Sequence, residues 1–509
     1  MNLINTLVKN ALLGTSKSAV SKSELPEAIA SLIDTQSVDQ EELLLKASGM
    51  AFSYRDAGFQ HPTTEPEHVD VAPEETKPYT SSAALEILKR LQRDQLDDLI
   101  IHWLSSCRQA GYIAHPAYIP GFLASGTTDL TVRQYLPDVL GARGQWLARK
   151  NPDWAYLNQP EDHLWQHGKH EERKAFFKLL RKKEPVNARK LLSTTWSQES
   201  ANHRADFLAF IRHGLSNEDL SFLESCINDK SRKVKSEAIK LLMLIPESSL
   251  SKKLIITAER YLQARKSKSL LGFGKESLAF EPAPIDLAWE KYGFPVESLD
   301  KQFTHEAYFF NGLLEVVRPS FWNDHLGLSS DKMMMILVKD KALKKFIPAL
   351  VKATALHQDA DWAKAILNMV YAEQEVVIEA LSDLLPSLVT ALSNEDKQYF
   401  FQKSIHHRAG KAGIGLVEYL NLCDFQWSLD FSKQALVKLY NNYADRGIQH
   451  YERDKFYRLN ASLNPDVLKQ KSIVLPPDGE RRQTWRENME KLFEAVELRK
   501  LINEAFNSK

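Results

Sequence analysis

The sequence predicts an all-α protein built as a HEAT-like helical repeat array, an α-solenoid with irregular loops. Short amphipathic patterns follow one another through most of the 509 residues, with the i, i+3, i+4, i+7 spacing of half-buried helices. No alternating run of the kind that forms a strand lasts more than a few residues, so we expect little or no sheet. Two helices open with similar residues at Ala188 and Val234, about 46 residues apart, a spacing typical of HEAT repeats.

Composition and pattern divide the chain into five segments. Residues 1–58 carry apolar clusters at helical spacing and are expected to be helical. Residues 59–80 are rich in proline and acidic residues, which is typical of an exposed linker. Residues 81–265 are expected to hold HEAT-like helical repeats, residues 266–330 an irregular junction rich in aromatic residues and prolines, and residues 331–509 further helical repeats.

Capping residues indicate where several helices begin. Asp94 can cap the helix that follows it, because a carboxylate accepts hydrogen bonds from the free N–H groups of a first turn. The Asn-Pro-Asp run at 151–153 is typical of a helix start, with asparagine as the cap and proline in the first helical position. Ser216 and Asp219 have the spacing of a capping box for the next helix.

The charge balance limits the partners that the whole chain can attract. Lys and Arg number 66, as do Asp and Glu, so the formal net charge is zero. This disfavours a chain-wide electrostatic attraction to nucleic acid and leaves a local basic face possible.

Cysteine usage and the N-terminus favour a cytoplasmic protein. Cys107, Cys226 and Cys423 lie far apart and form no CxxC pair, which indicates reduced, buried thiols instead of disulfides or a zinc knuckle. The first residues lack the pattern of a signal peptide, and no apolar run approaches the ~20 residues that span a bilayer. We expect cytoplasmic localisation.

No motif predicts catalysis. His163, His167 and His170 could place imidazoles on one helix face, but Gly168 interrupts the helical pattern and no acid or cysteine completes a metal site. Surface or capping histidines are favoured over a metal hydrolase. The Gly-Phe-Gly-Lys run at 272–275 lacks the first glycine and the hydroxyl of a P-loop. With no nucleophile elbow and no Cys–His signature, we expect a protein that is not an enzyme, with no catalytic residue, cofactor or metal.

The candidate partner-binding residues lie in one short segment. Trp146 and Trp154 stand near its ends, with Arg143, Arg149 and Asp153 beside them. The tryptophan rings can fill wide gaps between stacked helices. They can also be exposed in a groove, where an aromatic ring binds a peptide or a nucleic-acid base. The sequence leaves both interpretations open.

The same segment carries a family resemblance. The matching runs are Asn-Ala-Leu-Leu-Gly-Thr at 10–15, Leu-Gly-Ala-Arg-Gly-Gln-Trp-Leu at 140–147, Asn-Pro-Asp-Trp at 151–154, residues 173–180, Ala-Arg-Lys-Leu-Leu at 188–192, Trp196 with Glu199, and residues 229–238. They resemble a poorly characterised bacterial family of HEAT-like proteins, commonly encoded beside a MoxR-type AAA+ ATPase, a von Willebrand factor A-domain protein and a SWIM zinc-finger protein. The resemblance covers about residues 1–330 and implies a non-catalytic adaptor in a MoxR–von Willebrand system.

Two functions follow as hypotheses. The first is a scaffold that binds protein partners, among them the AAA+ ATPase or the von Willebrand A-domain protein of the resembled family. The alternative is nucleic-acid binding or DNA-base processing, since some alkyl-base DNA glycosylases are similar arrays of HEAT-like repeats. A tryptophan and Asp153 would then form the base pocket. The basic residues of such a cleft would be Arg143, Arg149, Lys150, Arg181, Lys182 and Lys183.

Overall fold

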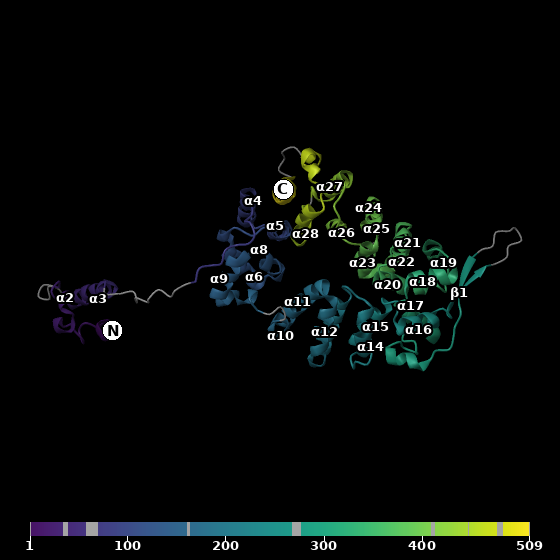
Figure 1. Ribbon diagram of the computed structural model, residues 1–509, viewed down its shortest axis with the longest axis horizontal. Coiled ribbons are helices and arrows are strands. Elements are labelled where there is room, and N and C mark those ends of the chain that lie inside the picture. Colours follow the sequence, from purple (N-terminus) through teal and green to yellow (C-terminus); the bar gives the residue numbers. More distant parts are fainter. Residues whose placement is uncertain are drawn as a thin grey trace. The chain divides into compact units, whose positions relative to one another are not determined.

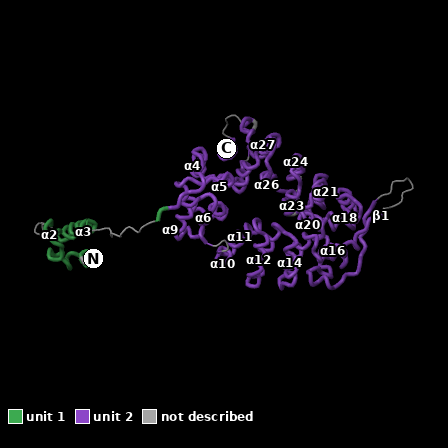
Figure 2. Tube along the Cα trace, viewed as in Figure 1, with its two compact units in different colours: residues 1–71 green, residues 72–509 purple. Residues whose placement is uncertain are grey.

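The structure is a computed structural model of the chain (Figure 1). The residues that it describes are 2–33, 39–57, 70–159, 163–266, 276–408, 413–445, 447–475 and 482–507. The chain forms two compact units, residues 1–71 and residues 72–509 (Figure 2). Their boundary falls within the predicted linker at 59–80, of which residues 59–69 lie outside the described residues, as does the Gly-Phe-Gly-Lys run.

The all-α prediction is confirmed. About 72% of the structure is helical and 2% is strand. Within the described ranges the strands β1 (Leu262–Lys266) and β2 (Glu276–Phe280) form one antiparallel hairpin, in which Leu262 lies opposite Phe280. The expectation of little sheet therefore agrees with the structure.

Unit 1 is a small helical body. Helix α1 (Asn2–Leu13) and the short α2 (Glu27–Ala30) both pack against α3 (Gln40–Ala57). The buried side chains that hold these helices together are few and mostly aliphatic. They are Leu7, Val20, Leu25, Ile29, Ala30, Ile33, Leu43, Ala47 and Ala51. The other apolar side chains in the described part of unit 1 are partly or largely exposed.

Unit 2 begins with a helical block that has its own core. Its elements, with 3-10 helices marked η, are α4 (Ser82–Arg93), α5 (Asp97–Ala110), η2 (Pro116–Tyr118), α6 (Ile119–Thr128), α7 (Leu130–Arg133), α8 (Leu136–Val139), α9 (Gly141–Lys150) and η3 (Pro152–Leu157). The prediction that Asp94 caps the following helix is wrong. Asp94 ends α4, donating its N–H to the carbonyl of Arg90, and Leu96 precedes α5 without a side-chain cap. Gln95 between them has a φ of 53°, so the chain turns before α5 can begin.

A run of paired helices follows. Its elements are α10 (His163–His167), α11 (His170–Lys183), α12 (Pro185–Thr195), η4 (Trp196–Gln198), α13 (Ala201–Ile211), η5 (Asn217–Asp219), α14 (Leu220–Cys226), α15 (Arg232–Met243) and α16 (Ser249–Ala258). Helix α13 packs against both α11 and α15, so these three helices form a row. They begin at residues 170, 201 and 232, which is a period of 31 residues.

The helices of this row start 31 residues apart, whereas the sequence predicted a spacing of 46 residues. Ala188 lies in α12, the helix that pairs with α11, whereas Val234 lies in α15 of the row itself. The two residues are therefore not equivalent positions, although both are fully buried. Ser200 and Ser231 are equivalent, because each accepts a hydrogen bond from an N–H in the first turn of its row helix.

The predicted irregular junction at 266–330 contains regular structure. After β2 come η6 (Leu287–Tyr292), α17 (His305–Leu314) and α18 (Pro319–Leu326). The aromatic residues of this segment fill the core: Phe310 stacks on Tyr261 and meets Phe346 edge to face, with ring centroids 5.4 and 5.2 Å apart. Aromatic content here reflects packing between helices and the hairpin.

The C-terminal part continues with helices that contact neighbours in the sequence. Its elements are α19 (Ser330–Lys339), η7 (Lys344–Phe346), α20 (Ile347–His357), α21 (Ala360–Tyr371), α22 (Glu375–Leu381), η8 (Ser382–Leu384), α23 (Leu385–Ala391), α24 (Asn394–Gln402), α25 (Ile405–Arg408), α26 (Leu416–Leu422), α27 (Leu429–Tyr443), η10 (His450–Glu452), α28 (Arg453–Arg458), η11 (Leu459–Ala461), η12 (Pro465–Ile473) and α29 (Gln483–Asn507). One continuous core runs from Trp165 to Val496.

The last helix joins the two cores of unit 2. The first half of α29 contributes Trp485 and Met489 to the long core. Its second half contributes Ile502 and Phe506 to the core of the first block, where Phe506 meets Trp103 edge to face at 5.4 Å. Helix α29 packs against α4 and α5, so the two ends of unit 2 lie together (Figure 1).

Candidate functional site

The predicted partner-binding residues lie on two contiguous elements. Helix α9 carries Arg143, Trp146 and Arg149, and η3 carries Asp153 and Trp154. The two elements pack against each other, so the structure brings the five residues into one region. The two arginines and Asp153 are exposed, whereas both tryptophans are half-buried.

The two tryptophans have different surroundings. Trp154 packs against the core of the first block, in agreement with the gap-filling interpretation. The indole Nε1 of Trp146 is shielded from solvent and has no hydrogen-bond partner in the described part of the chain. The exposed chemistry of this region is therefore mainly the charge of Arg143, Arg149 and Asp153.

Local sequence explains the start of η3. The Asn151 side chain accepts a hydrogen bond from the Asp153 N–H at 3.0 Å, and Pro152 occupies the first helical position. The prediction of a helix start at 151–153 is confirmed, in a 3-10 helix. A capped turn fixes the direction in which the chain leaves α9.

The start of α9 depends on a residue that the sequence did not single out. The Glu75 carboxylate accepts hydrogen bonds from the N–H groups of Ala142 and Arg143 at 2.7 and 2.9 Å. A negative charge is favourable at the N-terminus of a helix. Gly141 has a φ of 64°, and a Cβ there would lie 2.3 Å from the Glu75 carboxylate. The requirement for glycine at the head of the Gly-Ala-Arg-Gly run is thus steric and conformational.

The three histidines do not converge. His163 and His167 lie ring to ring at 4.8 Å on α10. His170 begins α11, stacks on His203 at 3.6 Å and contacts the Asp206 carboxylate at 3.2 Å. Among the described residues, no group of three or more His, Cys, Asp or Glu side chains is arranged to hold a metal ion.

Arg181, one of the six residues of the predicted basic cleft, is buried in the structure. Arg181 is fully buried and donates to the Asp219 carboxylate at 2.6 Å and to the carbonyl of Ile211 at 2.9 Å. Its inclusion in a nucleic-acid cleft is wrong, because its guanidinium cannot reach a ligand. Asp219 also closes the predicted capping box with Ser216.

The three cysteines are free and buried, as predicted. Burial raises the pKa of Cys107, Cys226 and Cys423 to about 12 in each case. A thiol with a raised pKa is a poor nucleophile at neutral pH.

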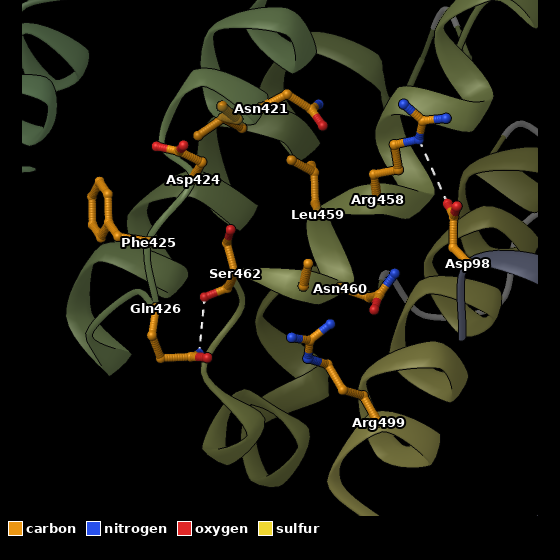
Figure 3. Close-up of a pocket in the computed structure, with 12 residues that line it drawn as sticks. Asp98, Asn421, Asp424, Phe425, Gln426, Arg458, Leu459, Asn460, Ser462 and Arg499 are labelled. Carbon is orange, nitrogen blue, oxygen red and sulfur yellow. Dashed lines mark hydrogen bonds and ion pairs between the residues drawn. The ribbon is translucent and has the colours of Figure 1, made fainter. Parts of the chain in front are cut away.

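A second candidate site is a pocket of about 610 Å³ in the C-terminal part (Figure 3). It lies where α5, α26, η11 and α29 meet, and Arg499 reaches into it from α29. The residues that line it are Asp98, Leu420, Asn421, Asp424, Phe425, Gln426, Arg458, Leu459, Asn460, Ala461, Ser462 and Arg499. No sequence signal indicates this pocket, because its residues are brought together only when α29 packs beside α5.

The charges around the pocket are unevenly paired. Arg458 lies 3.5 Å from Asp98, and Lys397 lies 3.2 Å from Asp424. Among the described residues no acid pairs with Arg499, and burial alone lowers the pKa of Arg499. Burial also lowers the pKa of the neighbouring His102, and the positive charge of Arg499 lowers it further. One positive charge is therefore left without a protein counter-charge in the described residues.

The chain was compared with protein families, curated proteins and solved structures. No curated protein and no solved structure matches the chain. In the part of the chain that the structure describes, no helix has both the length and the apolar character needed to cross a bilayer. Residues 6–506 match a family of unknown function, DUF5691. The chain therefore belongs to this family.

Proposed function

We propose that the protein is a non-catalytic scaffold that binds protein partners in the cytoplasm. Unit 2 is the scaffold, an α-solenoid of HEAT-like helix pairs, and unit 1 is a docking module. The row formed by α11, α13 and α15, with its period of 31 residues, supports the first part. In a solenoid each repeat contacts its neighbours, and the stack presents an extended surface to a partner.

The exposed apolar side chains of unit 1 carry the proposal. Leu12, Leu32 and Leu45 are 82%, 72% and 73% exposed, although the core of unit 1 is small. Val8 and Leu12 stand one turn apart on α1, so they share a face. Leu45 and Phe52 stand two turns apart on α3 and share a face in the same way.

This distribution favours a protein partner. Single exposed apolar residues are ordinary, but several on a small unit indicate an interaction surface. A few well-buried residues, with aromatic ones prominent among them, contribute most of the binding free energy in protein interfaces. Nucleic acid and small ions do not select exposed aliphatic side chains such as Leu12, Leu32 and Leu45.

The resemblance to proteins encoded beside a MoxR-type AAA+ ATPase suggests the partners. We propose the AAA+ ATPase or the von Willebrand A-domain protein as the ligand of unit 1. The exposed charges of Arg143, Arg149 and Asp153 supply a second contact on unit 2. The scaffold uses no cofactor and catalyses no reaction in this proposal.

Affinity purification of the full chain from its native host tests the proposal. The wild type is compared with the double variant Leu12→Glu, Leu45→Glu, which places charges in the apolar surface. A matched double variant, Gln40→Glu with Ser53→Glu, adds the same charges at exposed polar positions of α3. We expect an AAA+ ATPase or von Willebrand protein with the wild type and the control, with and without nuclease, and its loss in the first variant. Recovery of nucleic acid alone would instead support the alternative function.

A further inference from the structure

We propose that the pocket between α5, α26, η11 and α29 binds a small ligand with one carboxylate, which pairs with Arg499. This site is independent of the protein-binding surface proposed above, because it lies in unit 2 and takes a small molecule. The inference rests on the geometry of the pocket, the unpaired guanidinium and the unsatisfied amide beside it.

The guanidinium of Arg499 is the main recognition group. It is half-buried and forms no hydrogen bond or ion pair with any described residue. Figure 3 shows it extending from α29 toward the side of the pocket that holds Asn460 and Ser462. A partly desolvated guanidinium without a partner costs free energy, which a bound anion would recover.

The side-chain amides of Asn421 and Gln426 already donate their hydrogen bonds to carbonyl groups. The Asn421 amide nitrogen donates to the carbonyls of Val417 and Lys455, at 2.8 and 2.9 Å. The Gln426 amide nitrogen donates to the carbonyl of Ser462 at 3.0 Å (Figure 3). Because these amide donors are already used and Arg458 pairs with Asp98, the guanidinium of Arg499 is the unpaired cation that the pocket offers to a carboxylate.

Asn460 supplies the complementary feature. It is 5% exposed, and its amide nitrogen donates to the Tyr457 carbonyl at 2.6 Å. Its Oδ1 has no hydrogen-bond partner in the described chain. Buried acceptors are normally satisfied. Oδ1 is shielded from solvent in this conformation, and Asn460 lines the pocket, so a rotation of its side chain would bring this acceptor to a ligand N–H near the carboxylate. This arrangement points to an N-acylated amino acid or a ligand of similar chemistry.

Charge and shape favour a monocarboxylate over phosphate. Asp98 and Asp424 also line the pocket, each with a basic partner, so the net excess is the single charge of Arg499. A doubly charged phosphate would meet these two carboxylates with too few cations. Leu420 and Phe425 provide an apolar wall, and about 610 Å³ suits a small organic molecule.

Calorimetric titration of the purified full chain tests the site with three probes. N-acetyl-leucine carries the carboxylate, the N–H and an apolar side chain, N-acetyl-leucinamide lacks only the charge, and inorganic phosphate is a different anion. We expect saturable binding of the acid, with the amide at least about tenfold weaker, because a charge-assisted hydrogen bond is lost. Phosphate is expected to bind more weakly than the acid.

Variants on α29 assign the effect to Arg499. Arg499→Gln is expected to weaken binding of the acid at least about tenfold. Lys491→Gln removes the same charge from an exposed position of the same helix and is expected to leave binding unchanged. Arg499→Lys keeps the positive charge and loses the two-pronged geometry of the guanidinium, so it is expected to bind the acid with an intermediate affinity. If Arg499→Gln does not fold, the affinity of Arg499→Lys tests the role of Arg499 instead.

Several results would overturn the proposal. These are no saturable binding of the acid, equal affinity for acid and amide, tighter binding of phosphate, or unchanged affinity in a folded Arg499→Gln variant. None of these results bears on partner capture by unit 1, so the two proposals fail separately.

Discussion

Replacement of Arg181 by leucine should remove a large share of the stability of unit 2. The side chain is fully buried and pairs with Asp219, which is 1% exposed. Arg181 also donates to the carbonyls of Pro185, Ile211 and Gly214, so one guanidinium ties α11 to the turn that leads to α14. The contacts to Ile211 and Gly214 cross 30 and 33 residues of sequence.

The size of the stability loss depends on the hydrogen bonds that Asp219 keeps after the substitution. In Arg181→Leu the Asp219 carboxylate keeps the Ser216 N–H at 3.0 Å and a longer contact to Arg189 at 3.3 Å. Breaking a buried ion pair from one side costs about 3–5 kcal/mol. The carbonyls that lose their donor add to this cost, and Arg189 offsets part of it, so we expect a loss of about 3–5 kcal/mol.

Urea unfolding followed by tryptophan fluorescence measures the loss. Arg232→Leu, at an exposed position of α15, is the matched control and should change the free energy of unfolding by less than about 0.5 kcal/mol. Arg181→Leu combined with Asp219→Leu should be more stable than Arg181→Leu alone, because no buried carboxylate is left without Arg181, and Arg189 keeps Glu218 at 3.8 Å. A loss below about 1 kcal/mol in Arg181→Leu, or a double variant that is less stable still, would refute the reasoning.

Three further predictions concern a glycine, a histidine and the three cysteines. Gly141→Ala forces a φ of 64° on alanine and a Cβ onto the Glu75 carboxylate, so thermal unfolding should show a loss of about 1–3 kcal/mol. Burial lowers the pKa of His406 to about 3, so His406 is neutral in the folded state. The contribution of neutral His406 to the free energy of unfolding is present above pH ~6.5 and is lost as the pH falls toward 3. The free energy of unfolding of His406→Gln should therefore depend less on pH between these values than that of the wild type. The three buried cysteines should react with a disulfide reagent at pH 8 only after unfolding, and rapid native labelling would contradict their raised pKa.

Local signals in the sequence were the ones that predicted structure. The cap at Asn151 and the capping box of Ser216 and Asp219 involve atoms within three residues of each other, so the sequence determines them directly. The second role of Asp219, the ion pair with Arg181, crosses 38 residues and has no local signature. The Glu75 cap on α9 escapes prediction for the same reason.

The predicted spacing of 46 residues joins two helices that are not equivalent, because residue type alone does not distinguish the two helices of a packed pair. The residues around Ala188 and Val234 look alike since both helix openings combine basic residues with one buried apolar residue. The spacing of 31 residues between α13 and α15 is marked by Ser200 and Ser231, which cap these two neighbouring helices. A cap marks a position along a helix, whereas an apolar residue marks only a face.

The two candidate sites differ in how much of each could be predicted from the sequence. The predicted residues of α9 and η3 are neighbours in the chain, so their proximity follows from local structure. The pocket around Arg499 combines α5 with α26, η11 and α29. That arrangement depends on Ile502 and Phe506 entering the core of the first block, a contact that crosses most of unit 2.

Site-specific photocrosslinking in the native host tests the central claim, that unit 1 docks a protein partner. A photoreactive benzoylphenylalanine replaces Phe52, which is 47% exposed on α3, and the control replaces Tyr451 of unit 2, which is 78% exposed. The scaffold proposal predicts that position 52 crosslinks to an AAA+ ATPase or von Willebrand A-domain protein and position 451 does not. Crosslinks from position 52 only to the chain itself, or equal yields from both positions, would contradict it.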